Sequence, residues 1–142
     1  MYLKKHAKVS RYDSENLFFS LLIDTLKEGG YDSYGVLIEY PLNRLVPPSL
    51  SLPKELREYA SRSWSHIDFL IYKKTTKRPI LAIEVDGHRY HRASYSRAAS
   101  VQQKRDTLKD NLLCLIGLPL IRLSTTGSNE KSRILDALSA NR

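Results

Sequence analysis

Three acidic residues, Asp68, Glu84 and Asp86, have types and spacing that could do chemistry. They fall in two apolar segments, residues 66–72 and 79–86, which are predicted to be strands joined by a polar turn. With the turn centred on Thr76, Asp68 lies opposite Glu84, and side-chain alternation places Asp86 on the same face. Opposed carboxylates destabilise a sheet unless a cation neutralises them. Their hard oxygens suit Mg²⁺ or Mn²⁺ better than zinc, so we predict a metal site formed by these acids.

The alternative interpretation is an ordinary solvent-facing hairpin with acids on its outer face. The register argues against it, because the acids share their face with apolar residues that helices would cover: Leu70, Ile80 and Ala82. The other face pairs only apolar residues in this register: Ile67 with Val85, Phe69 with Ile83 and Ile71 with Leu81. We therefore expect a sheet buried on both faces, with the acids at its end.

The segment 98–116 is predicted to be a helix with two stripes. Its apolar stripe is expected to pack on the sheet and consists of Val101, Leu108, Leu112 and Leu115. A polar stripe of Gln102, Asp106 and Lys109 runs beside it, with Arg105 between the two. Such a stripe could serve the acidic site, or it could be a helix boundary with a weak Asp106–Lys109 pair.

The loop after the second acidic strand mixes histidines, tyrosines and arginines. His88 and His91 form only a weak zinc pattern, so we hold His91 as a phosphate or water contact. Arg92 and Arg97, interleaved with tyrosines, suit phosphates and stacked bases, although a solvated loop would look the same. The only cysteine, Cys114, excludes a disulfide framework, and Cys114 and the only tryptophan, Trp64, are expected to be core residues.

The remaining elements complete an α/β order. A helix is expected from Asp13 or Ser14 to the Gly29-Gly30 pair, and a strand over residues 34–40. Further expected elements are a short helix over 53–60, a strand over 118–123 and a last helix capped by Ser128. The predicted order is α-β-β-β-α-β-α around a central mixed sheet, in one domain over residues 13–142 preceded by a flexible basic arm over 1–12.

The charge and hydropathy of the chain limit the classes of partner that it could bind. The chain has 142 residues, a net charge of +8 and a pI of about 9.6, which suit a polyanionic partner such as a nucleic acid, although solubility alone would also account for this charge. No long apolar stretch or signal-peptide pattern is present, so we expect no membrane contact and a cytoplasmic location.

These patterns together resemble the PD-(D/E)xK nuclease superfamily, which has a restriction-endonuclease-like core. The resemblance rests on residues 66–71, residues 81–87 with Tyr90-His91, and the later segments 102–110, 117–122 and 124–128. It covers residues 14–138 and is most similar to a helicase-associated branch, found at the C-terminus of superfamily 1 DNA helicases.

The resemblance implies Mg²⁺- or Mn²⁺-dependent DNA cleavage, with DNA and a helicase domain in the same polypeptide as partners. The catalytic residues that it implies are Glu15 in the first helix, Asp68, Glu84, Asp86, Gln102 and Lys109. Asp86 stands where the superfamily usually has a lysine, and related branches move that role to the next helix, where Gln102 and Lys109 lie. Lys109 is preferred to Lys104 because it shares a helical face with Gln102 and Asp106. The DNA-binding candidates are His91, Arg92, Arg97, Lys104 and Arg105. The alternative function is a catalytically inactive DNA-binding or docking module of a helicase.

Overall fold

The computed structural model describes residues 13–86, 97–124 and 129–141. Helices and strands follow the predicted α-β-β-β-α-β-α order, with a short helix and a 3-10 turn inserted after the first strand. The elements are α2 (Asp13–Glu28), β1 (Tyr34–Pro41), η1 (Leu42–Arg44), α3 (Lys54–Ser61), β2 (His66–Lys73), β3 (Pro79–Asp86), α5 (Arg97–Ile116), β4 (Leu120–Ser124) and α6 (Glu130–Ala140). The α/β prediction is confirmed.

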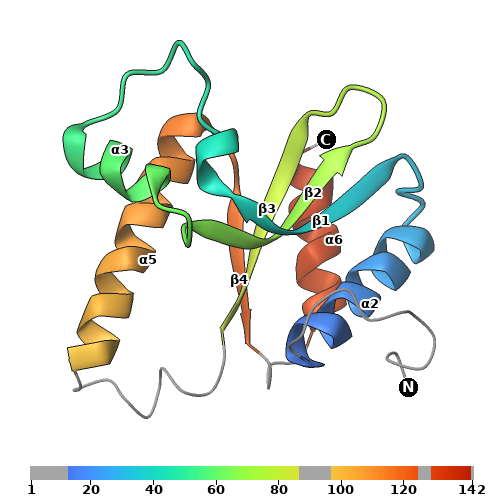
Figure 1. Ribbon diagram of the computed structural model, residues 1–142. Helices are drawn as coiled ribbons and strands as arrows, with labels where there is room; N and C mark the ends of the chain where they lie inside the picture. Colours follow the sequence, from blue (N-terminus) through green and yellow to red (C-terminus); the bar gives the residue numbers. More distant parts are fainter. Residues whose placement is uncertain (1–12, 87–96, 125–128, 142) are drawn as a thin grey trace.

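The four strands form one mixed sheet in the order β1-β2-β3-β4. β1, β2 and β3 are antiparallel neighbours, whereas β4 runs parallel to β3. The chain needs a long crossover to reach a parallel strand, and α5 provides it. Helices α2 and α6 lie on one side of the sheet and α3 and α5 on the other (Figure 1).

The hairpin register is as predicted over its central part: Phe69 pairs with Ile83 and Ile71 pairs with Leu81. The register shifts next to Ile71, because Tyr72 pairs with Pro79 and leaves Ile80 as an extra residue. A bulge turns the extra side chain toward the face of its neighbour. Ile80 is therefore buried with the α2 and α6 cluster, and its predicted place on the acidic face is wrong.

Two apolar clusters hold the layers together. The first joins α2 and α6 to the sheet and includes Phe18, Leu22, Phe69 and Ile134. The second lies under α3 and α5 and includes Leu70, Ala82 and Leu112, so the acidic face of the hairpin is covered by helices, as expected. Simple alternation places Ile67 with Phe69 and Ile71 in the first cluster, and this prediction is wrong, because Ile67 belongs to the second cluster. Regular pairing is interrupted beside it: Glu39 of β1, between the partners of Phe69 and Ile67, has a φ of 46°.

Helix α5 is rotated relative to the prediction by roughly a quarter turn, at 100° per residue. Leu112 and Leu113 are buried, whereas Val101 and Leu115 are 43% and 51% exposed. The turn that contains Lys109 faces the sheet instead, because its ammonium group pairs with an acid there. Cys114 is exposed and is not the core residue that its apolar neighbours suggested.

The ends of the elements follow local chemistry. Gly30 and Gly117 have φ values of +78° and +81° directly after α2 and α5, which is the left-handed conformation of a helix C-terminus. The N-cap position of α6 is Asn129, with a φ of 69°, one residue after the predicted Ser128. No described helix is long and apolar enough to cross a membrane. The predicted basic arm over residues 1–12 lies outside the described residues.

Candidate active site

Asp68 of β2 and Glu84 of β3 are held side by side by backbone hydrogen bonds from the opposite strand. The backbone N–H of Asp68 donates to Oε2 of Glu84 at 2.7 Å, and the N–H of Val85 donates to Oδ2 of Asp68 at 2.8 Å. Regular β2–β3 pairing ends at Phe69 and Ile83, so the two carboxylates replace backbone carbonyls as acceptors beyond that point. This reciprocal arrangement fixes both acids with little side-chain freedom.

Lys109 of α5 completes this group. Its ammonium group donates to Oε1 of Glu84, and the two side chains are only 11% and 9% exposed. The lysine reaches the acid because α5 packs on this face of the sheet, where Leu112 and Leu113 share an apolar cluster with Ala82 of β3. One positive charge thus lies against two neighbouring carboxylates.

Burial is the main influence on the pKa values of these acids. Desolvation raises the pKa of Glu84, the ammonium of Lys109 lowers it, and the charge of Asp68 raises it, with a net upward shift. The pKa of Asp68 is also raised, first by desolvation and further by the nearby charge of Glu15, against hydrogen bonding from Val85 and the charge of Lys109. An added cation would therefore favour the ionised form of both acids.

The donor chemistry fits a hard divalent cation held by Asp68 and Glu84. Among the side chains that the structure describes, no three His, Cys, Asp or Glu gather closely enough to hold a metal ion on their own. Mg²⁺, however, usually keeps several waters and takes only one or two protein carboxylates. The pair is sufficient for that mode of binding.

The structure places the other predicted catalytic residues, Glu15, Gln102 and Asp86, in different surroundings. Glu15 in α2 is close enough for its charge to influence the pKa of Asp68. The amide nitrogen of Gln102 donates to Oδ1 of Asp106 at 2.9 Å, so the structure places Gln102 on its own helix neighbour. For Asp86 the structure describes the backbone at the end of β3, paired with Ser124, and the side chain lies outside the described ones.

The predicted DNA-binding residues are described only in part. Lys104 is 72% exposed and lies 3.6 Å from Glu55, away from the acidic pair. The guanidinium of Arg105 lies 4.4 Å from the centre of the Trp64 ring. His91, Arg92 and the side chain of Arg97 lie outside the described residues.

Two further residues at the site were not predicted. Tyr59 of α3 is buried, and burial together with the charges of Glu84 and Asp106 raises its pKa to about 12. Arg122 of β4 is the parallel-register neighbour of Glu84, and its guanidinium lies 2.7 Å from Oδ1 of Asp110 and 4.0 Å from Oδ1 of Asp106. Side-chain alternation along β4 could have indicated Arg122, whereas the short helix that carries Tyr59 has no local signal for a site.

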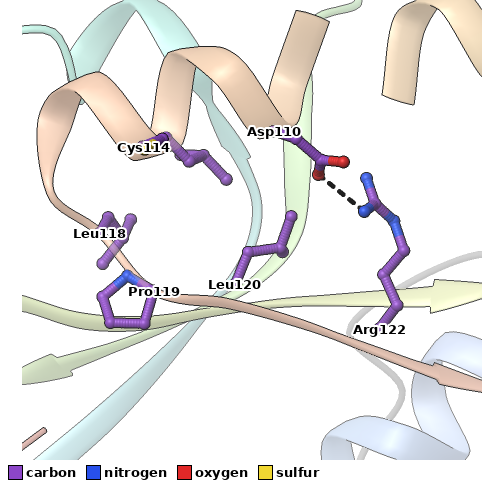
Figure 2. A pocket seen from close by; sticks show the side chains of 7 residues that line it. Asp110, Cys114, Leu118, Pro119, Leu120 and Arg122 are labelled. Atoms are coloured by element: carbon purple, nitrogen blue, oxygen red, sulfur yellow. Dashed lines mark hydrogen bonds and ion pairs between the residues drawn. The ribbon is translucent and has the colours of Figure 1, made fainter. Parts of the chain in front are cut away.

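A surface pocket of about 430 Å³ lies between α5 and β4 (Figure 2). Its lining mixes polar and apolar groups, with the Asp110–Arg122 ion pair at one side and Cys114 at the other. Neither Asp68 nor Glu84 lines it. We therefore place the candidate chemistry at the acidic pair and not in this pocket.

Comparison with known proteins gives a family and no function. No curated protein and no solved structure matches the chain significantly. A family model described as a protein of unknown function, DUF2726, matches residues 9–141, nearly the whole chain. The chain therefore belongs to the DUF2726 family.

Proposed function

We propose that this chain is a divalent-metal-dependent DNA phosphodiesterase domain of the PD-(D/E)xK type. The observation that carries the proposal is the placement of Lys109 on Glu84, beside Asp68, at the end of two adjacent strands. The resemblance expects an ammonium group two residues after the strand acid, where this chain has Asp86. A lysine from the next helix supplies that group instead.

Asp68, Glu84 and Lys109 each have a role in the proposed reaction. Asp68 and Glu84 would hold the cation, which supplies an activated water and offsets charge on the phosphate. Lys109 donates a hydrogen bond to Glu84, and in this proposal it would also donate to the attacked phosphate or to the attacking water. Its burial strengthens that interaction, because a charge in a poorly hydrated site is weakly screened.

The basic balance of the chain supports DNA as the substrate. Its net charge is +8, and contacts to phosphates would release counterions, so affinity for DNA should fall steeply as salt is raised. A fusion to a helicase domain belongs to the same proposal and rests on the resemblance alone.

The second candidate function, an inactive DNA-binding or docking module, has one observation in its favour. Lys109 already neutralises Glu84, as a bound cation would, so the site is partly compensated without metal. The two candidates differ in turnover. The test is incubation with linear, nicked and branched DNA in Mg²⁺, Mn²⁺ or EDTA, with Asp68→Asn as the matched control. Metal-dependent product that is absent with Asp68→Asn supports the nuclease, and DNA binding without product under every condition supports the module.

A further inference from the structure

Trp64 lies in the connection between α3 and β2 and carries two guanidinium groups on its ring. The guanidinium carbon of Arg105 lies 4.4 Å from the ring centroid and that of Arg62 lies 5.4 Å from it. Tyr59 contacts the indole edge-on, with ring centroids 5.9 Å apart. Despite these neighbours, Trp64 is 43% exposed, so its predicted place in the core is wrong.

Neither of these two arginines is paired with a carboxylate among the described residues. In the part of the chain that the structure describes, neither Arg62 nor Arg105 forms an ion pair, whereas the neighbouring Lys104 lies near Glu55. A guanidinium stacked on an aromatic ring keeps its N–H groups at its edge, where they can bind a phosphate. The exposed part of the indole is a surface on which a nucleic-acid base can stack.

The position of this cluster relative to the acidic pair is set by α5. Arg105 and Lys109 are four residues apart, so they lie on one side of the helix about 6 Å apart along its axis. Tyr59 is related to both groups, because its ring contacts Trp64 and the charge of Glu84 contributes, after burial, to the raised pKa of its hydroxyl. The Trp64 cluster and the acidic pair are therefore contacted from adjacent turns on the same side of α5.

We propose that Arg62, Trp64 and Arg105 form a strand-binding site that stacks an unpaired DNA base on the indole and binds the adjoining phosphate with the guanidiniums. The inference rests on the proposed function in taking DNA as the ligand. It adds a contact outside the acidic pair and a preference for unpaired bases, because bases inside a continuous duplex do not expose their faces. The cluster is called the Trp64 site below.

The chain offers a direct assay, because Trp64 is its only tryptophan. In EDTA, an oligothymidylate single strand should quench the tryptophan fluorescence of the unmodified chain to saturation. A covalently closed circular duplex at the same nucleotide concentration should quench it far less. Unchanged emission with the single strand, or equal quenching by both DNAs, would overturn the proposal.

Variants then test the energetic role with a labelled oligothymidylate followed by fluorescence anisotropy. Trp64→Leu should weaken binding by roughly 5- to 160-fold, the range for losing one stacked base, and Trp64→Phe should recover part of it. Arg105→Gln should weaken binding and lower its salt dependence, whereas Arg78→Gln, at the exposed β2–β3 turn, is the matched control for the lost charge. Equal affinities for Trp64→Leu and the unmodified chain would refute the site.

Because binding is measured in EDTA, the two proposals fail separately. Metal-dependent cleavage without quenching leaves the nuclease standing and removes the Trp64 site. Quenching by single strands without cleavage under any metal condition keeps the site and removes the nuclease.

Discussion

The Glu84–Lys109 ion pair can be tested through folding stability, without DNA. Both side chains are about nine-tenths buried, so removing one partner leaves the other as an uncompensated charge in a poorly hydrated place. Breaking such a pair costs about 3–5 kcal/mol, whereas replacing both partners with neutral residues is close to neutral. The structure therefore predicts strong coupling between the two substitutions.

Lys109→Met should be the more damaging single change at neutral pH. It leaves two neighbouring carboxylates without their ammonium, for which we expect a loss of about 3 kcal/mol, the low end of the range because protonation of either acid limits the cost. Glu84→Gln should cost less, about 1–2 kcal/mol, since Lys109 keeps the charge of Asp68 nearby. The double variant should lie within about 1 kcal/mol of the parent.

The assay is urea unfolding followed by circular dichroism in EDTA. It compares the free energies of unfolding of the parent, the two single variants and the double variant, evaluated with one common m-value. For a chain of this size, the loss predicted for Lys109→Met corresponds to a melting temperature lower by about 6–12 °C. Lys54 and Glu58 form a matched exposed pair at 3.9 Å, and their cycle should show coupling under about 0.5 kcal/mol. Additive effects of Glu84→Gln and Lys109→Met would refute the buried pair.

Three further outcomes follow from the same site. Asp68→Asn should gain stability relative to the parent as the pH rises through the raised folded pKa of Asp68. Because the pKa of Asp68 is raised in the folded chain, its protonated carboxyl stabilises the fold below its ordinary pKa of 3.8. This contribution to the free energy of unfolding is lost as the pH rises through the folded pKa. A pH-independent difference in urea unfolding would contradict this. If the parent cuts DNA, Lys109→Ala should lose roughly two or more orders of magnitude in rate with its fold intact. Lys104→Ala should lose far less rate, since Lys104 lies near Glu55 and not on Glu84, and the reverse result would show that the wrong lysine was assigned. Tyr59→Phe should remove one phenol that ionises near pH 12 in a spectrophotometric titration, and an unchanged upper end of the curve would refute its burial beside Glu84.

The hairpin could be predicted from the sequence because its information is local. Two apolar segments separated by a short polar turn allow few registers, and a one-residue slip would place Asp68 or Glu84 in the apolar core. The pairing of Phe69 with Ile83 follows from that constraint alone. The bulge at Ile80 could not be predicted. Both faces of the sheet are buried there, so an apolar side chain at this position satisfies the hydrophobic pattern on either face.

The rotation of α5 could not be read from its periodicity. The apolar arc of Val101, Leu108, Leu112 and Leu115 and the polar stripe beside it compete for the same face of the sheet. Hydrophobic burial alone favours the arc, but the end of β3 presents a buried acid that needs a counter-charge. Turning Lys109 toward Glu84 supplies that charge and leaves Val101 and Leu115 exposed.

The same competition explains why Trp64 is not a core residue. A single tryptophan in a small domain is usually assigned to the core, because burying its large ring is strongly favourable. Here the ring instead stacks with Arg62 and with Arg105 of α5, and the rotation of α5 determines where Arg105 lies. The ion pair at Lys109 and the stacked arginine one turn earlier are therefore two consequences of one helix orientation. A substitution that frees α5 from Glu84 should loosen both, and this makes Trp64 fluorescence a reporter of the acidic pair even without DNA.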